Sequence, residues 1–201
     1  MPAGRFEMER RLLITGFDPF GGEQINPSWE AVKGLPDQVG SFSLKKLQIP
    51  TKFRLGAAAV LEAAAEWKPD VILCVGQAGG RATVTPERIG VNLRDARICD
   101  NAGLCPNQEA IVPGGPDGIF STLPVKTLAA AVEQAGYPGA VSNTAGTFVC
   151  NEVLYTLLHH FTGTQVRVGF IHVPYLPEQG SPNMPLEDIR GALEAIIQAL
   201  S

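Results

Sequence analysis

The sequence predicts a single-domain α/β fold, a three-layer sandwich in which helices cover both faces of a mostly parallel, twisted sheet. Short apolar runs alternate with longer helical patterns, and parallel strands need crossover connections of that kind. The run Val71–Val75 is continuously apolar, which suits a central strand buried on both faces. The 201 residues are enough for one sizeable core and few for two, and no linker or internal repeat interrupts them.

The predicted elements alternate in chain order. The strands expected are Arg11–Thr15, Phe42–Ile49, Val71–Val75, Gly139–Ser142 and Val166–Ile171, with Thr83–Leu93 extended. The helices expected start at Asn26-Pro27, run from after Pro50-Thr51 to Trp67, cover Pro124–Gln134 and Phe148–His160, and begin again near Pro185. Between them, Asp95–Ile119 is expected to be a long loop.

The helix boundaries have local signals. Asn26 is a favourable N-cap, and Pro27 suits the first helical turn. Pro69 stops the alanine-rich helix after Trp67. The last helix has its apolar positions spaced for one face, at Leu186, Ile189, Leu193, Ile196, Ile197 and Leu200. Such a helix can bury that face against a sheet.

Composition excludes several classes of function. With 45% hydrophobic and 18% charged residues and a net charge of −4, the chain has no basic surface for nucleic acid or an anionic membrane. The apolar runs Leu55–Ala65 and Ala192–Leu200 carry charges or end short of the ~18–20 residues that a membrane helix needs. The first residues mix acidic and basic groups and are not a secretory signal. We expect residues 1–10 to be an extension, disordered or added for expression, and 11–201 to form the domain.

The four cysteines argue against a disulfide framework. Cys74 lies inside the predicted central strand, and Cys150 lies at a helix start. Cys99 and Cys105 share a loop six residues apart, with no further Cys/His cluster that would complete a zinc site. Without an export signal, a reducing cytoplasmic location is expected, and we predict no metal.

One end of the sheet is predicted to hold the functional site. In open α/β sheets, ligands bind beyond the carboxyl ends of the strands. Glycine-rich loops follow the strands that end at Thr15, Val75 and Ser142, and His172 follows the strand Val166–Ile171. All four features would gather at that end, which predicts one active site.

Cys150 and His172 indicate a cysteine-nucleophile hydrolase. A thiol in the first turn of a helix lies near the positive end of the dipole and unpaired N–H groups, which are expected to lower its pKa. One imidazole can accept the proton of the thiol and later protonate the leaving amine. The alternatives are a small buried hydrophobe at Cys150 and a satisfied core histidine at His172. His159 and His160 end a helix and are expected at the surface.

A third group usually fixes the tautomer of such a histidine. Glu87 lies among apolar and β-branched residues in the extended segment. It is either paired with Arg88 or a neighbouring arginine in a structural ion pair, or it is a functional carboxylate. Spacing alone leaves both interpretations open.

The glycine-rich loops are expected to bring backbone close to a ligand. Gly76–Arg81 lacks the lysine and Ser/Thr of a phosphate-binding P-loop and does not have dinucleotide-binding spacing. In Gly16–Gly22, Phe17 and Phe20 are poorly placed for a core, so we expect them to line an apolar pocket. Asp18 is expected to cap locally or pair with an arginine, without a catalytic role.

Ordered motifs from about residue 11 to the C-terminus resemble the pyroglutamyl peptidase I (pyrrolidone-carboxylate peptidase) family of cysteine peptidases. They are Gly16–Gly22 with Asn26-Pro27, Val75–Arg81, Pro86–Ile89, Asp95–Ile98, Ser142–Asn151 and Gly169–Gln179. Two departures are visible: Cys99 stands where the family usually has proline, and Phe161–Val166 is short. Neither departure touches the residues that the family uses for catalysis.

The resemblance implies a cytoplasmic cysteine exopeptidase that releases N-terminal pyroglutamate (5-oxoproline) from peptides. It implies no metal or other cofactor and assembly of the single domain into a homotetramer. Cys150 would be the nucleophile that forms a thioester, His172 the base and then the acid, and Glu87 the carboxylate that orients His172. The residues implied around the pyrrolidone ring are Phe17, Phe20, Thr51, Gln77, Ile98, Phe148 and Val149, with Arg97 near the developing oxyanion.

The chemistry of the ring agrees with that assignment. Pyroglutamate is a neutral, flat lactam, whereas unblocked glutamate or glutamine would bury an unpaired ammonium at a cost of several kcal/mol. The backbone N–H of Cys150 is the first oxyanion donor expected.

Two other functions remain open. One is a cysteine amidohydrolase of the same fold that acts on another cyclic amide or acyl group. The other is a phosphorylase-like enzyme or ligand-binding module, because glycine-rich loops can hold phosphate. An inactive homologue is disfavoured, since all three catalytic positions are filled.

Overall fold

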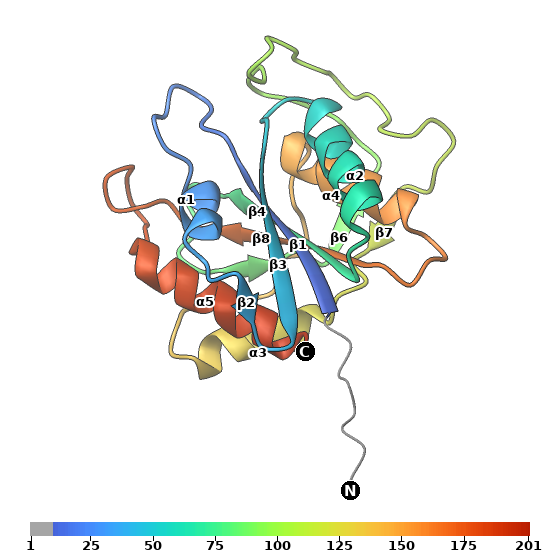
Figure 1. Cartoon of the computed structure of the whole chain (residues 1–201). Coiled ribbons are helices and arrows are strands. Elements are labelled where there is room, and N and C mark those ends of the chain that lie inside the picture. Colours follow the sequence, from blue (N-terminus) through green and yellow to red (C-terminus); the bar gives the residue numbers. More distant parts are fainter. Residues whose placement is uncertain (1–9) are drawn as a thin grey trace, which may run out of the picture.

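A six-stranded sheet forms the middle layer of the protein, in the order β2-β3-β1-β4-β8-β5 (Figure 1). The structure, a computed structural model, describes residues 10–201, so the expected extension lies outside the described residues except for Arg10, which begins β1. The strands are β1 Arg10–Phe17, β2 Gln38–Val39, β3 Phe42–Ile49, β4 Val71–Gln77, β5 Thr85–Pro86, β6 Ile89–Val91, β7 Gly118–Phe120 and β8 Arg167–Val173. The helices are α1 Pro27–Lys33, α2 Leu55–Trp67, α3 Val125–Gln134, α4 Val149–His160 and α5 Leu186–Ala199.

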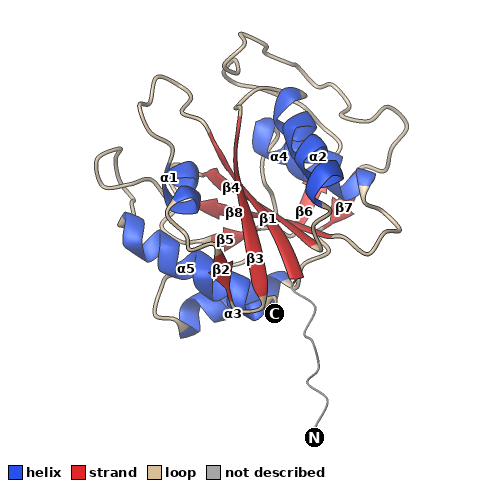
Figure 2. Ribbon diagram, in the orientation of Figure 1, coloured by secondary structure: helices blue, strands red, loops and turns tan. Residues whose placement is uncertain are grey.

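The predicted α/β sandwich is confirmed. In the six-stranded sheet, strands β3, β1, β4 and β8 pair in parallel, whereas the edge strands β2 and β5 are antiparallel to their neighbours. Helices α1, α3 and α5 pack on one face and α2 and α4 on the other, so each face has its own hydrophobic core (Figure 2). In β4, Leu73 and Val75 belong to the first core, and Ile72 and Cys74 to the second. The continuous apolar run therefore serves both faces.

Local signals placed the helix boundaries well. Asn26 caps α1, since its side-chain oxygen accepts from the N–H of Ser28, and Pro27 is the first helical residue. Helix α2 ends at Trp67, followed by Lys68 in the left-handed conformation. His159 and His160 are exposed at the end of α4, as expected. For these helices, sequence signals within a few residues were thus sufficient to predict where each helix begins or ends.

The segment Gly139–Ser142 is not a strand, which corrects one prediction. It lies parallel to the segment around β5 but makes only two isolated bridges, Val84 with Gly139 and Glu87 with Ser142. The physical reason is that β5 has only two residues, and one of them is Pro86, which has no N–H to donate. The ladder between the two segments therefore stays too short to count as a strand.

The carboxyl ends of β1, β4 and β8 lie at one edge of the sheet. The loop after β1 and the long loop between β6 and β7 rise above this edge, at the top of the view in Figure 1. The long loop ends in β7, a short strand antiparallel to β6 that the sequence reasoning missed. Within residues 10–201, none of the helices has the length and apolar character needed to cross a membrane.

Candidate active site

Cys150 is the second residue of α4, and its sulfur lies above the backbone of β4. A Cβ built on Gly76 would stand 2.9 Å from the Cys150 Sγ and 2.8 Å from the ring of Phe170. Real Cβ contacts are not that short, so the thiol occupies space that only glycine leaves open. The glycine loop was expected to approach a ligand closely, but at Gly76 the close neighbour is the side chain of Cys150.

His172 lies on the same face of the sheet as this thiol. It is the register partner of Gly76 in the parallel ladder between β4 and β8, and partners in such a ladder point to the same side. Its ring centroid lies 4.8 Å from that of Phe170, which packs in the core under α2 and α4. The predicted convergence of Cys150 and His172 at the carboxyl edge is thus present in the fold.

Glu87 is fully buried and binds His172. Its Oε1 lies 2.7 Å from His172 Nδ1. An ionised carboxylate can only accept, so Nδ1 carries the hydrogen and Nε2 is the ring nitrogen left for the thiol. Burial raises the pKa of Glu87, but the hydrogen bond and charge of His172 outweigh it, helped by Ser142 and Arg81, so the pKa lies below its usual value. Glu87 is therefore a carboxylate.

The ion-pair interpretation of Glu87 is confirmed, and its role as a functional carboxylate beside His172 stays a prediction. Arg81 Nη1 donates to Glu87 Oε1 over 2.6 Å, so the acid has an arginine partner as well as the histidine. Arg88 is not that partner, because its Nε donates to Asn143 Oδ1. Arg81 is the site residue that sequence reasoning missed. The available signal was an arginine directly after a glycine loop, a few residues before a predicted buried acid.

The pKa of the Cys150 thiol is raised, which corrects the expectation that the helix start lowers it. Burial raises the pKa of Cys150 to about 12, with further increases from the charges of Glu87 and Cys74 and an opposing effect of Arg81. Removal from water thus outweighs the favourable field of the helix N-terminus. The resting thiol is neutral and needs a base at the moment of reaction.

A pocket of about 660 Å³ opens beside the start of α4. Its lining residues are Phe20, Asp95, Arg97, Ile98, Ala145, Gly146, Thr147 and Phe148. The rings of Phe20 and Phe148 stand 5.9 Å apart and provide an apolar wall. Four of the predicted substrate residues therefore line this pocket: Phe20, Arg97, Ile98 and Phe148.

Two of the other predicted substrate residues lie in the core. Phe17 is only 2% exposed and packs against Phe170, with ring centroids 6.2 Å apart. The expectation that it is poorly placed for a core is wrong, because β1 extends to Phe17. Val149 is fully buried in the same core.

Thr51 and Gln77 are held by polar contacts. The N–H of Thr51 donates to Asp18 Oδ1, so this acid holds a segment 33 positions further along the chain and does not cap its own loop, which corrects the expectation of a local cap. The Oε1 of Gln77 accepts from Gln179 Nε2 over 3.0 Å, which fixes its amide. The contacts of these two residues with a ligand stay predictions.

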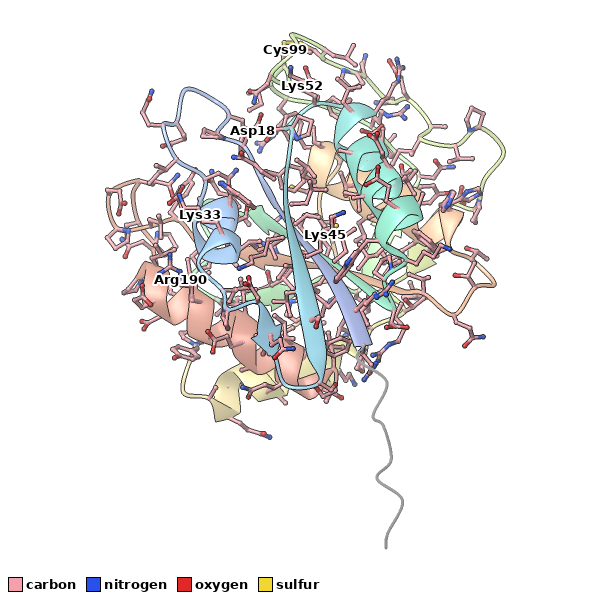
Figure 3. All side chains as sticks on the ribbon, in the orientation of Figure 1. Asp18, Lys33, Lys45, Lys52, Cys99 and Arg190 are labelled. Carbon is pink, nitrogen blue, oxygen red and sulfur yellow. A yellow bond between two sulfur atoms is a disulfide. The ribbon has the colours of Figure 1, made fainter. Side chains whose placement is uncertain are left out.

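Cys99 and Cys105 form a disulfide, although the sequence argued against a disulfide framework, and Cys74 and Cys150 are free thiols. Asp100 explains why the two meet, since its Oδ1 accepts from the N–H groups of Ala102 and Leu104 and curls the loop. Cys99 lies at the tip of this loop in Figure 3, at the same end of the molecule as Asp18. Within the described part of the chain, no group of three or more His, Cys, Asp or Glu side chains is arranged to hold a metal ion.

The glycines around Arg81 serve internal contacts. A Cβ on Gly79 would stand 2.2 Å from the Tyr175 hydroxyl, just as one on Gly76 would meet Cys150. The loop therefore packs against side chains of this protein at both glycines.

Comparison with known proteins agrees with this geometry. The family model described as pyroglutamyl peptidase matches residues 10–201. The pyrrolidone-carboxylate peptidase of Levilactobacillus brevis is 51% identical over 195 residues, covering 92% of this chain and 95% of that protein. The enzyme of the same name from Staphylococcus saprophyticus is 48% identical over 200 residues and covers 94% of each chain.

Solved structures agree as well. The crystal structure of pyroglutamyl peptidase I from Bacillus amyloliquefaciens has a TM-score of 0.92 at 46% identity, over 96% of this chain and 95% of that one. Pyrrolidone carboxyl peptidase from Thermococcus litoralis has a TM-score of 0.91 at 33% identity, over 94% and 92% of the two chains. Both the sequence and the fold thus match over nearly the whole length, and the chain belongs to the pyroglutamyl peptidase family of cysteine-type hydrolases.

Proposed function

We propose that this protein is a cysteine exopeptidase that releases N-terminal pyroglutamate from peptides. The observation that carries the proposal is the Glu87–His172 hydrogen bond of 2.7 Å at the edge of the sheet where the Cys150 thiol rests on Gly76. A buried carboxylate that orients an imidazole beside a thiol is the arrangement that nucleophilic catalysis needs.

The first half of the reaction starts from the neutral thiol. His172 Nε2 takes the proton from Cys150 while Sγ attacks the carbonyl carbon of the pyroglutamyl residue. Glu87 accepts from Nδ1 and stabilises the imidazolium that forms. The C–N bond then breaks, His172 gives the proton to the departing amine, and a thioester remains on Cys150.

The second half returns the enzyme to its starting state. His172 Nε2 removes a proton from a water molecule, whose oxygen attacks the thioester carbonyl. The C–S bond breaks, pyroglutamate leaves, and the proton on the imidazole returns to the sulfur. His172 thus serves as base and acid in each half, which requires that Glu87 hold one ring orientation throughout.

The start of α4 supplies the oxyanion donor. N–H groups in the first turn have no acceptor within the helix, and Phe148 provides no side-chain cap. We assign the N–H of Cys150 to the developing oxyanion, with Arg97 in the wall of the same pocket as a second donor. Loss of one such donor costs roughly 3 kcal/mol of transition-state stabilisation.

The pocket suits a lactam ring. Phe20 and Phe148 present uncharged faces to a flat, neutral ligand. The ammonium of an unblocked N-terminal glutamine would lose its hydration against the same wall. We therefore propose selectivity for the pyroglutamyl group over open-chain N-termini.

The test is hydrolysis of a chromogenic pyroglutamyl amide by the wild type and the Cys150→Ser variant, with acetyl and prolyl amides for comparison. We expect turnover of the pyroglutamyl amide alone, lost in the variant, and a thioester on the Cys150 peptide in mass spectra of quenched reactions. Equal turnover by both proteins would contradict the cysteine mechanism. A preference for the acetyl amide would favour the amidohydrolase alternative.

A cytoplasmic location and a homotetramer are further proposals that rest on the family resemblance. Phe120 is 65% exposed on the edge strand β7, and a contact between subunits would cover such a side chain. Light scattering at several protein concentrations tests the assembly, and a monomer at every concentration would contradict it.

A further inference from the structure

Within residues 10–201, the guanidinium of Arg81 donates three hydrogen bonds, to Thr85, Glu87 and Thr144, which lie around the proposed catalytic residues. Its Nη1 donates to Glu87 Oε1 over 2.6 Å and to Thr85 Oγ1 over 2.7 Å. Its Nη2 donates to the carbonyl oxygen of Thr144 over 3.1 Å. The guanidinium is partly exposed, with 29% of the side chain accessible, whereas the carboxylate that it binds is fully buried. Arg81 therefore lies between the buried Glu87–His172 pair and the solvent.

The contact with Glu87 determines how the carboxylate faces His172. Oε1 accepts both from His172 Nδ1 and from Arg81 Nη1, whereas Oε2 is buried without a hydrogen-bond partner. The hydroxyl of Ser142, the neighbour that also lowers the pKa of Glu87, donates to the Thr144 carbonyl instead. Two donors on a single oxygen thus hold the carboxylate, and one of them is the histidine that must be oriented.

The contact with Thr144 reaches the other side of the site. Thr144 precedes the turn Ala145–Phe148, which lines the pocket and leads directly into α4 and Cys150. The side chain of Thr144 also accepts from the N–H of Gly146. The same guanidinium therefore contacts the segment that leads to the nucleophile and the acid that orients the base.

We propose that Arg81 is a positioning residue for the proposed reaction: it holds Glu87 against His172 and ties that pair to the loop that leads to Cys150. It does not act on the substrate itself. This inference rests on the proposed function for its kinetic consequences, while its effect on the Cys150 thiol is measurable without any substrate.

If the Arg81–Glu87 ion pair served only stability, mutation of Arg81 would have different effects from those expected of a positioning residue. If Arg81 only stabilised the fold, its loss would lower the melting temperature and leave the pH dependence of activity unchanged. If it positions the catalytic groups, its loss removes a donor that lowers the pKa of Glu87 and a charge that lowers the pKa of Cys150. Besides Arg81, the groups that lower the pKa of Glu87 are His172 on β8 and Ser142. The groups that raise the pKa of Cys150 are Glu87 and, on β4, Cys74.

The sign of the pH effect follows from these contacts. Glu87 must be ionised to orient His172, and the pKa of Glu87 rises without Arg81. Activity is then lost at a higher pH as the solution is acidified. The thiol of Cys150 likewise becomes harder to ionise, so its alkylation profile moves to higher pH.

The experiment compares Arg81→Met and Arg81→Lys with a matched control, Arg88→Met. Arg88 follows Glu87 in the chain and contacts the loop after Ser142 through Asn143, but within residues 10–201 its guanidinium forms no hydrogen bond or ion pair with the Glu87 carboxylate or with His172. On a fluorogenic pyroglutamyl amide, we expect kcat of Arg81→Met to fall about 10–100-fold with KM changed less than about 3-fold, as is typical of groups that support a catalytic ligand. Arg81→Lys should recover part of kcat, since a lysine keeps the charge but loses the two separate guanidinium nitrogens that bind Glu87 and Thr144.

The second readout is the rate at which iodoacetamide alkylates Cys150, followed on its peptide by mass spectrometry across a range of pH. The Arg81→Met profile should shift to higher pH, while Arg88→Met follows the wild type. Unchanged kcat and an unchanged alkylation profile in Arg81→Met would overturn the proposal. So would an equal loss of activity in Arg88→Met. If Arg81→Met does not fold, kcat of Arg81→Lys decides, because the lysine keeps the charge but loses the paired N–H donors, and a kcat equal to that of the wild type would overturn the proposal.

The two proposals fail in distinguishable ways. A wild type that is alkylated at Cys150 but does not hydrolyse the pyroglutamyl amide contradicts the proposed function, and the alkylation profiles still decide the role of Arg81. An active wild type with an Arg81→Met variant of normal kcat and profile contradicts the role of Arg81 alone.

Discussion

Gly76 lies directly beneath the Sγ of Cys150, so that a Cβ at position 76 would stand 2.9 Å from the sulfur. The thiol of Cys150 therefore lies against the backbone of β4 at a position without a side chain, one strand away from His172, the register partner of that glycine. The position of the sulfur is set by the sheet as well as by α4.

Gly76→Ala is expected to displace the thiol and to lower kcat at least about 100-fold, because misplacement of a reacting group by about 1 Å can have an effect of that size. The extra methyl also meets the Phe170 ring and should destabilise the fold by about 1–3 kcal/mol. The matched control is Gly169→Ala on β8, whose Cβ would meet Leu123 in the opposite core. Kinetics and urea denaturation should show that the control loses stability with little change in kcat. An equal loss of kcat in both variants would contradict the specific role of Gly76.

Glu87→Gln is expected to lower kcat about 10²–10⁴-fold, because an amide no longer dictates which nitrogen of His172 carries the hydrogen. Steady-state kinetics on the pyroglutamyl amide measure the effect. Glu187→Gln is the matched control, since that acid is exposed on α5 and forms a surface ion pair with Arg190. A kcat near that of the wild type in Glu87→Gln would exclude the orienting role.

Stability should also depend on pH through Glu87. Its pKa in the folded protein lies below the ordinary value of 4.5, so the contribution of its carboxylate to stability is complete above about pH 4.5. That contribution is lost as the pH falls through the lowered folded value. Melting temperatures measured between neutral and strongly acidic pH should fall less steeply for Glu87→Gln than for the wild type. Parallel curves would contradict the lowered pKa.

The Cys150 thiol should be neutral in the resting enzyme, because its pKa is raised to about 12. The ultraviolet absorbance of thiolate, taken as the difference between wild type and Cys150→Ser, should be absent at neutral pH. The rate of turnover should fall in heavy water, since proton transfer to His172 accompanies the attack on the carbonyl. A thiolate signal at neutral pH would show that an ion pair with His172 forms before the substrate binds.

The Cys99–Cys105 disulfide is expected to support the pocket and not the chemistry. It closes the loop directly after Arg97 and Ile98, which line the pocket, and Asp100 inside it accepts from the N–H of Phe53. Cys105→Ser should therefore raise KM several-fold with a smaller change in kcat. On the chain-entropy account, a bridge of this span contributes roughly 2 kcal/mol to stability. Reductant should reproduce both effects in the wild type and add nothing in the variant.

The elements that were predicted well have causes that lie within a few residues. The N-cap at Asn26, the stop before Pro69 and the apolar run Val71–Val75 are all local signals, and each has its counterpart in the fold. Strand pairing is different, because it depends on what lies opposite. The bridges of Gly139–Ser142, for example, depend on Val84 and Glu87, which lie much earlier in the chain.

The candidate site likewise combines features that the local sequence reveals with features that depend on distant residues. A thiol at a helix start and a histidine at a strand end are visible in the sequence, but the acid that binds the histidine is 85 positions away from it. Only the family resemblance favoured Glu87 as that acid. The contact of Arg81 with Thr144 spans 63 positions and has no local signature. The raised pKa of Cys150 likewise arises from burial that the helix start alone does not reveal.

The order of strands in the sheet has a consequence for when the protein becomes active. Strand β8 is the last strand in the chain, yet it lies between β4 and β5, which are made much earlier. A chain still being synthesised holds Cys150 and Glu87 before it holds His172, and the β5 segment has no neighbour in the sheet until β8 arrives. On the proposed mechanism, the nascent protein is expected to be inert towards peptides around it until this late strand docks.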